Sequence, residues 1–216
     1  MMTQTKKKYA ALIIYLLLFY AVWTVFELFI KEHIRSPLVN AGVIKTAVWV
    51  LPAVLLVRKF DNGVQVGLKE MFTAKVKWWR YLWVYAILAA WVLLGGFFQQ
   101  GGLSFVLNAD DLVMVLFVGV TEEMVFRGWL LNATVRDMPT WLAVSLNAVL
   151  FLAIHFPRWI QEGIFASIMG SVNFVGLLIL SAIFSLSFLK SKNIWIPVTM
   201  HMFYDLMMVV FLPQVP

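Results

Sequence analysis

Residues 112–133 read LVMVLFVGVTEEMVFRGWLLNA, an apolar run with the length, roughly 20 residues, that crosses a bilayer as a helix. Near its middle it carries three charged residues, Glu122, Glu123 and Arg127. Each ionised group there costs on the order of 2.5–3.5 kcal/mol for insertion, whereas each Leu, Val or Phe returns only about 0.3–0.6 kcal/mol. A helix of this composition must therefore turn its charged face toward a cavity or toward other helices.

Six further apolar runs of similar length accompany this one, at residues 9–30, 38–57, 81–98, 140–156, 172–189 and 194–212. Of the 216 residues, 62% are hydrophobic and only 13% are charged, which excludes a soluble globular domain. The runs lack the alternation of β-strands, and lipid cannot satisfy free backbone amides. We therefore predict an all-α polytopic membrane protein, residues 1–216 forming one integral membrane domain. It has seven transmembrane helices, or eight if residues 158–171 hold a re-entrant or interfacial element.

The cations lie in the loops between these runs. Twelve fall on one side of the predicted bundle and only three, Lys31, Arg35 and Arg158, on the other, so the positive-inside rule predicts a cytoplasmic N-terminus. Lys45 and Glu27 lie near the outer ends of their spans and are expected to reach the headgroups. A nucleic-acid binder would gather its cations into one solvated patch. The net charge of +6 therefore reflects the topology of a multi-pass cell-membrane protein. We expect this protein to contact the lipid bilayer and not to bind nucleic acid.

The charges of the fourth span are expected to divide their roles. Glu123 and Arg127 are four residues apart, on one face of a helix and close enough for an ion pair, whereas Glu122 points about 100° away from Glu123. We therefore predict that Glu123 is paired and that Glu122 is free. The three charges could serve only to hold helices together, but intramembrane ionisable residues usually mark functional sites. A free carboxylate can take a proton from water and later return it.

Two histidines and a further acid lie inside other spans. His155 ends the sequence FLAIH at residues 151–155, and His201 and Asp205 lie four apart in HMFYD at residues 201–205. A single buried histidine is usually bonded to a backbone carbonyl. Here two imidazoles with Glu122 and Asp205, brought together from three helices, supply a general base and hydrogen-bond donors, or equally metal ligands. The chain contains no cysteine, so a metal such as zinc would depend on Glu122, His155 and His201.

Straight, upright helices would keep the two histidines apart. At 1.5 Å per residue, His155 lies roughly 24 Å from the cytoplasmic start of its span and His201 about 10 Å from the start of its own. A tilt, a kink, or a later start of the fifth span after Pro139 is needed to bring them level.

Together, the three segments resemble the signature of the CPBP family, the CAAX proteases and bacteriocin-processing enzymes, also called the Abi family. The family pattern is EExxxR, then FxxxH, then HxxxN or HxxxD. The chain has EEMVFR at residues 122–127, followed by FLAIH and HMFYD in the same order. The likeness covers residues 112–212, the expected catalytic core, and is specific because three motifs occur in order, each inside a span.

The resemblance implies an intramembrane endopeptidase that hydrolyses a peptide bond in a membrane-associated peptide or protein. By this resemblance, Glu122 and His155 would activate the attacking water. His201 and Asp205 would stabilise the oxyanion. Glu123 and Arg127 would hold the site in shape. Some relatives carry Asn where this chain has Asp205. An ionised Asp cannot donate to an oxyanion, so Asp205 must either orient His201 or carry a proton. The short chain without long soluble loops is typical of a bacterial member.

Two other functions remain open from the sequence. A bacteriocin-immunity or regulatory membrane protein on the same fold would bind a peptide without cleaving it, but such a binder needs no unpaired carboxylate beside two imidazoles. A proton-coupled transporter also uses buried Glu and His. The charges here cluster in the C-terminal half, however, and repeated halves are absent. We therefore expect a peptide hydrolase of the glutamate or metallo type, with no certain cofactor and zinc as the alternative.

Overall fold

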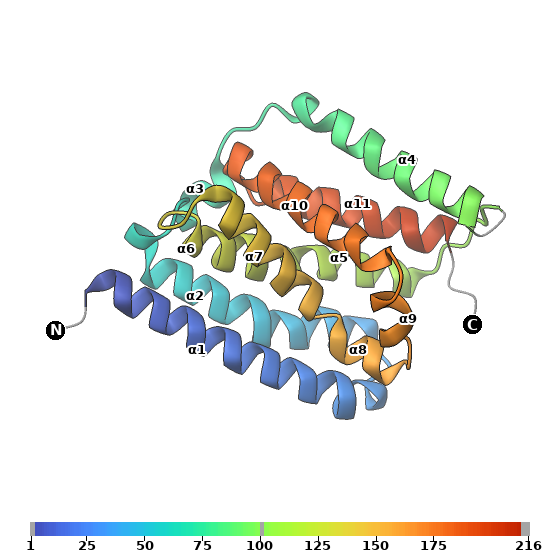
Figure 1. Ribbon diagram of the computed structural model, residues 1–216, viewed down its shortest axis with the longest axis horizontal. Coiled ribbons are helices and arrows are strands. Elements are labelled where there is room, and N and C mark those ends of the chain that lie inside the picture. The colour runs from blue at the N-terminus through green and yellow to red at the C-terminus, as the bar shows by residue number, and fades with distance from the viewer. Residues whose placement is uncertain (1–2, 100–101, 213–216) are drawn as a thin grey trace.

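The computed structural model describes residues 3–99 and 102–212, and every regular element within those ranges is a helix. The long helices run side by side along the longest axis of the molecule (Figure 1). Each of the seven predicted runs coincides with a helix or a chain of helical segments. The all-α fold class is therefore confirmed.

The first half of the chain forms three long helical rods. The first comprises α1 (Gln4–Val25), a π-helical turn (Phe26–Ile30) and a 3₁₀ turn (Lys31–His33), and the second comprises two π-helical segments (Leu38–Ile44 and Thr46–Val50) and α2 (Leu51–Lys59). After a short 3₁₀ turn (Asp61–Gly63) and α3 (Leu68–Thr73), the third rod comprises a 3₁₀ turn (Trp78–Tyr81) and α4 (Leu82–Gln99).

The second half supplies four more rods and a short connection. The fourth rod comprises α5 (Ala109–Glu123), a π-helical segment (Met124–Leu131) and α6 (Asn132–Thr134). The remaining helices are α7 (Thr140–Ala153), α8 (Phe156–Gln161), α9 (Phe165–Met169), α10 (Asn173–Ser191) and α11 (Trp195–Phe211). The end of α8 and the short helix α9 lie within residues 158–171, the region where an eighth element was an alternative.

Five helices are long and apolar enough to cross a membrane, namely Gln4–His33, Leu38–Lys59, Trp78–Phe98, Thr140–Gln161 and Asn173–Ser191. Large apolar side chains on their outer faces, such as Leu17 and Phe29, are exposed, as expected where lipid is the solvent. Helix α11 is apolar but shorter, and the fourth rod carries the charges. A multi-pass membrane protein is therefore supported, while the total of seven spans and the cytoplasmic N-terminus remain predictions.

The fourth rod forms the centre of the bundle. Every residue from 121 to 134 is buried. Helices α2, α7, α10 and α11 pack around this rod, whose α5 label lies near the middle of Figure 1. The predicted need to turn its charges toward other helices is met, because the side chains of both Glu123 and Arg127 are 0% exposed.

The predicted fifth span, residues 140–156, lies within the apolar helical stretch Thr140–Gln161, which turns near its end. A kink in this span was one of the alternatives that the sequence left open. Helix α7 ends at Ala153, the chain turns at Ile154 and His155, and α8 begins at Phe156. Pro157 lies in the first turn of α8, where its missing N–H leaves no hydrogen bond unmade. The break places His155 at the junction of two helices.

Candidate active site

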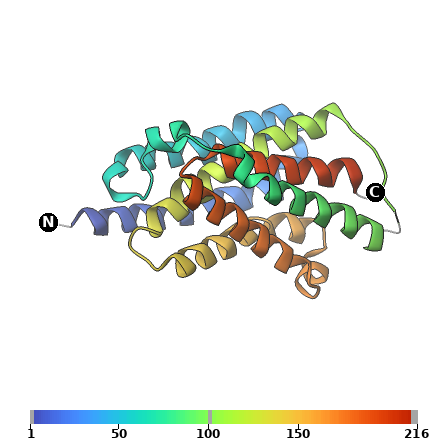
Figure 2. The same cartoon turned by 90° about the horizontal axis from the view of Figure 1, so that it is seen from above.

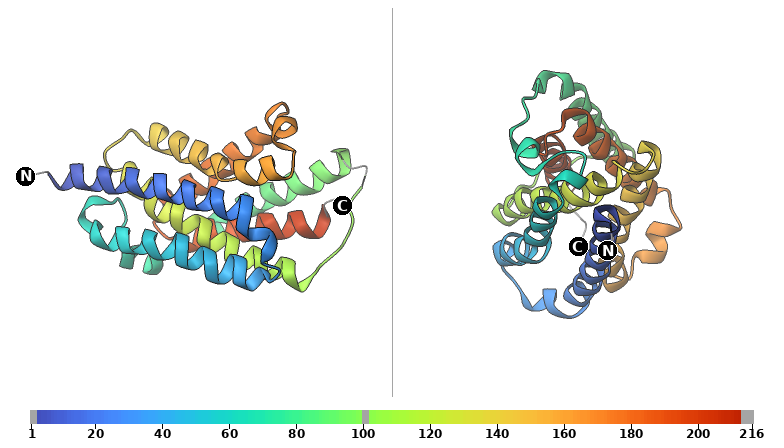
Figure 3. Two further views of the ribbon diagram at one scale, coloured as in Figure 1. Left: turned by 90° about the horizontal axis from the view of Figure 1, so that it is seen from below. Right: turned by 90° about the vertical axis from the view of Figure 1, so that its left-hand side faces the viewer.

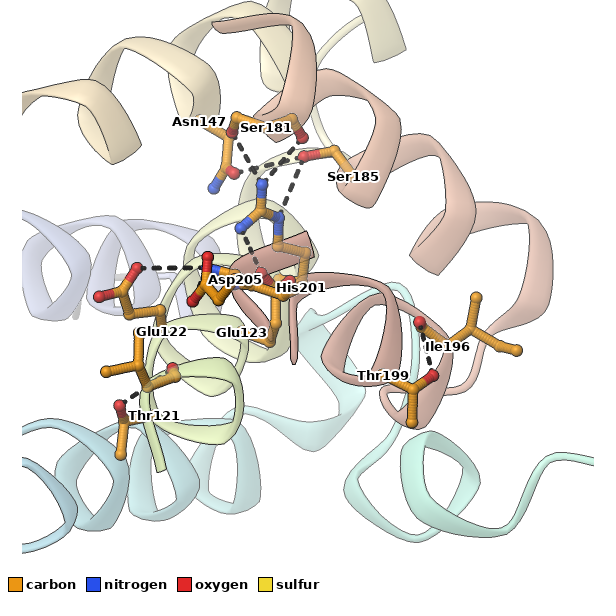
Figure 4. Close-up of polar contacts among 12 residues, drawn as sticks. Thr121, Glu122, Glu123, Asn147, Ser181, Ser185, Ile196, Thr199, His201 and Asp205 are labelled. Carbon is orange, nitrogen blue, oxygen red and sulfur yellow. Dashed lines mark hydrogen bonds and ion pairs between the residues drawn. The ribbon is translucent and has the colours of Figure 1, made fainter. Parts of the chain in front are cut away.

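Glu123 and Arg127 form the ion pair that their spacing predicts. Arg127 Nη1 donates to Glu123 Oε1 over 2.9 Å, and both side chains are fully buried. Figure 4 shows Glu123, Ser181 and Ser185 among the polar contacts of this region. The guanidinium also donates from Nη2 to the carbonyl and the hydroxyl oxygen of Ser181, at 2.9 and 2.8 Å, and from Nε to Ser185 Oγ at 3.4 Å. Arg127 therefore ties the central rod to α10.

Two phenylalanines complete the surroundings of this guanidinium. Its Cζ atom lies 4.8 Å from the centre of the Phe151 ring and 5.5 Å from that of Phe184. Cation–π contacts of this kind are strongest where water is excluded. The charge of Arg127 is thus held by a carboxylate, hydroxyl and carbonyl oxygens, and two aromatic faces, as a buried cation requires.

His201 joins the same network from α11. Its Nδ1 atom lies 2.8 Å from Glu123 Oε1, the oxygen that also receives Arg127. Because a carboxylate oxygen accepts, Nδ1 carries the hydrogen of this bond. The other ring nitrogen, Nε2, then faces Asp205 Oδ2 at 3.5 Å and Glu122 Oε2 at 4.0 Å.

His155 is oriented by its own helix. Its Nδ1 atom lies 3.1 Å from the carbonyl oxygen of Phe151, which can only accept, so Nδ1 carries a hydrogen here too and Nε2 can receive a proton. The rings of His155 and His201 both pack edge-on against Phe151, at centroid distances of 5.5 and 5.8 Å. The two histidines therefore meet at Phe151, although straight, upright helices would have kept them apart.

A cavity of about 390 Å³ brings the predicted catalytic side chains together. Glu122, His155, His201 and Asp205 all line it, and they come from α5, the α7–α8 junction and α11. Glu123 and Arg127 lie behind this wall and are not among its lining residues. The six predicted residues thus separate into four that border the cavity and two that support them.

Lys45 is a cavity residue whose place in the site the sequence did not predict. Its ammonium lies 3.5 Å from Glu122 Oε1, and the buried side chain contacts the indole rings of both Trp23 and Trp49, 4.9 and 4.7 Å from their centres. The prediction that Glu122 is free is therefore wrong, as is the prediction that Lys45 reaches the headgroups. Lys45 lies two turns inside its rod, between two π-helical segments, a feature often found at functional sites. The available signal was an ionisable residue within an apolar run.

Glu27 was also predicted to extend toward the headgroups, and this is wrong. Its residue exposure is 2%, and its carboxylate binds Lys31 Nζ at 2.7 Å, one helical turn later. Both residues line the cavity. The side chain of Glu27 is buried inside the protein and does not reach the membrane surface, because the cavity lies against this end of the first rod.

Three polar residues in apolar helices also belong to the supporting structure and were not predicted. Ser181 and Ser185 bind Arg127, as described above, and Asn147 Nδ2 donates to the carbonyl oxygen of Phe126 over 2.7 Å. Ser185 Oγ lies 3.4 Å from Asn147 Oδ1, which links α7 to α10. The spacing of four between Ser181 and Ser185 places both on one helix face and was the available signal.

A metal ion does not fit these residues. Within residues 3–99 and 102–212, no three His, Asp or Glu side chains are arranged to hold a metal. Glu122, His155 and His201 share the cavity, but the ammonium of Lys45 already lies beside the Glu122 carboxylate. A second cation bound there would be repelled by the first in a medium of low dielectric constant. The residues that line the cavity therefore offer their own side chains for chemistry and no site for a metal ion.

Comparison with known proteins is consistent with the three motifs. A family model described as Rce1-like, type II CAAX prenyl endopeptidase, matches residues 78–207. The matched region contains all six predicted site residues but neither Lys45 nor Glu27. No curated protein and no solved structure matches the chain.

Proposed function

Because the chain belongs to the Rce1-like family of type II CAAX prenyl endopeptidases, we propose that it is an intramembrane endopeptidase whose attacking water is activated by Glu122 and His155. Its substrate is a membrane-associated peptide or protein. The observation that supports the mechanistic part is the shared cavity, in which two carboxylates, Glu122 and Asp205, and two imidazoles from three segments face the same space. A purely structural ion-pair cluster would not need to line a cavity.

Glu122 serves as the general base. A water molecule between Glu122 and His155 gives a proton to the carboxylate as its oxygen bonds to the carbonyl carbon of the substrate. His155, whose Nδ1 hydrogen is held by Phe151, orients this water through the acceptor Nε2. A positioned general base contributes about 10²–10⁴-fold in rate.

The electron pair of the substrate carbonyl then moves onto its oxygen, which needs hydrogen-bond donors. With a carboxylate facing each of its ring nitrogens, His201 can carry hydrogens on both and offer Nε2–H to the oxyanion. Asp205 orients this imidazole rather than donating itself. Lys45 offers a second donor on the opposite side of Glu122, and each such donor is worth about 10²–10³-fold.

Collapse of the tetrahedral intermediate returns the proton. The protonated Glu122 gives its hydrogen to the nitrogen of the leaving amine as the carbon–nitrogen bond breaks, and the carbonyl double bond reforms. The base thus ends in its starting ionised state, and the reaction consumes one water per peptide bond. Glu123 and Arg127 take no part in these transfers and act by holding His201.

The test is a comparison of new N-termini in membranes from cells that produce either the wild-type chain or its Glu122→Gln variant. New termini that depend on Glu122 support the protease. The ion pair between Lys45 and Glu122 favours a second candidate, a non-proteolytic immunity or regulatory protein, because a paired carboxylate can be purely structural. That candidate predicts identical termini in the two membranes.

A further inference from the structure

The lining of the cavity extends to the loops at one end of the described bundle. Apart from the site itself, its lining includes Lys31, Ile34, Arg35, Pro37, Arg158 and Met208. These residues belong to the end of the first rod, the turn after it, α8 and the end of α11. In Figure 1 this end lies to the right, around α8 and α9, opposite the end marked N. No lining residue comes from the loops at the N-terminal end.

The N-terminal end of the bundle holds most of the cations. Contacts between distant segments assemble it: Lys8 Nζ binds the carbonyl oxygens of Gly63 and Ala133 and the Asp137 carboxylate, at 2.7, 2.7 and 2.6 Å. Figure 2 and the end-on view in Figure 3 show these segments gathered at the same end. Twelve cations lie there: Lys6, Lys7, Lys8, Arg58, Lys59, Lys69, Lys75, Lys77, Arg80, Arg136, Lys190 and Lys192.

The mouth of the cavity has the opposite character. Its cations are Lys31, Arg35 and Arg158, and two of these are matched by acids, Lys31 by Glu27 and Arg158 by Glu162. Loops with an excess of Lys and Arg stay in the cytoplasm, whereas acidic residues contribute little to orientation. Twelve Lys and Arg residues lie at the N-terminal end and three at the mouth. The positive-inside rule therefore places the mouth on the side of the membrane away from the cytoplasm.

We propose that the cavity opens on the extracytoplasmic face of the membrane and that its substrate is a peptide segment presented on that face. This rests on the proposed protease function. The segment would enter between the ends of the first rod, α8 and α11, and its scissile bond would reach Glu122 inside the bilayer. Peptides that remain entirely in the cytoplasm would not gain access.

The absence of cysteine from the chain allows a clean test of sidedness. Single cysteines are introduced as Ser36→Cys and Gln161→Cys beside the mouth, Asn40→Cys in the cavity lining, and Gln65→Cys at the cation-rich end. Ser36, Gln161 and Gln65 are exposed, and none of the four is a proposed catalytic group. A membrane-impermeant methanethiosulfonate reagent is applied to intact bacterial cells and, in parallel, to permeabilised cells.

We expect Ser36→Cys, Asn40→Cys and Gln161→Cys to react to the same extent in intact and permeabilised cells, and Gln65→Cys to react only after permeabilisation. The reverse pattern would overturn the proposal, because the cavity would then open into the cytoplasm. Labelling of Ser36→Cys without labelling of Asn40→Cys would also overturn it, because the cavity would not be continuous with that face.

The proposal and the protease function fail in different experiments. Cysteine labelling reports the side of the mouth whether or not any peptide is cleaved. Cleavage is measured separately, with an internally quenched peptide library added to right-side-out and to sealed inside-out vesicles that contain the wild-type chain. Cleavage confined to right-side-out vesicles supports an extracytoplasmic opening, and cleavage confined to inside-out vesicles contradicts it. The cysteine-labelling result is independent of both outcomes.

Discussion

His201 donates from Nδ1 to Glu123 Oε1 over 2.8 Å, and the same oxygen receives Arg127 at 2.9 Å. The first and third sequence motifs therefore meet at one atom. Because this contact commits Nδ1 as a donor, Nε2 is the nitrogen that faces the cavity. The ion pair of Glu123 and Arg127 thus fixes the direction in which the imidazole of His201 points.

Replacing Arg127 should unfold the site. The Arg127→Met change leaves Glu123 buried without its cation, and breaking a buried pair in this way costs about 3–5 kcal/mol. Thermal unfolding in detergent should show a large loss of stability. Arg158→Met is the matched control, because Arg158 pairs with Glu162 at an exposed site and its loss should cost at most about 1 kcal/mol. Equal stability of the two variants would argue against a supporting role.

Asp205→Asn should keep most of the activity. The amide oxygen can still accept from Nε2 of His201, so the imidazole remains oriented, whereas Asp205→Ala removes that acceptor. We expect the rate of peptide cleavage by Asp205→Asn to stay well above that of Asp205→Ala. If Asp205→Asn were as slow as the alanine variant, the negative charge itself would be required and simple orientation would be the wrong role.

Lys45 should matter for the rate although it lies outside the matched family region. Lys45→Ala is expected to lower turnover by about 10²-fold, the typical effect of losing one oxyanion donor. Lys59→Ala is the control, since Lys59 is exposed at the end of the same rod. Added methylamine should restore turnover in Lys45→Ala in a saturable manner, which a packing defect would not allow. Absence of rescue together with normal folding would count against the donor role.

Removal of metal ions should leave cleavage unchanged, because Lys45 already supplies positive charge beside Glu122. The measurement is the activity of the purified protein after treatment with 1,10-phenanthroline and dialysis. Loss of activity that zinc alone restores would show that the cavity rearranges to bind a metal and that the side-chain mechanism is incorrect.

Sequence reasoning reached the helical fold and the pair formed by Glu123 and Arg127, because both follow from local periodicity. Apolar runs define helices, and a spacing of four places two residues on one face. The same reasoning placed Glu122, His155, His201 and Asp205 in one site because ionisable groups inside a membrane must find one another or a cavity.

The partners of Lys45 could not be predicted in this way. Whether a lysine two turns inside a span extends to the headgroups or turns inward depends on what packs against it, here Trp23 from another rod and Trp49 one turn later. That information is tertiary. A kink in the fifth span was among the alternatives, but its position at His155 could not be predicted, since Pro157 permits a helix to start and does not require the preceding one to stop.

The most direct test of water activation by Glu122 is the rate of peptide cleavage by purified protein in liposomes, compared among the wild type, Glu122→Gln and Glu162→Gln. Glu162 is exposed and serves as the matched control. We predict that Glu122→Gln is slower by about 10²–10⁴-fold while remaining folded, and that Glu162→Gln cleaves like the wild type. Cleavage by Glu122→Gln at the wild-type rate would contradict the proposed chemistry.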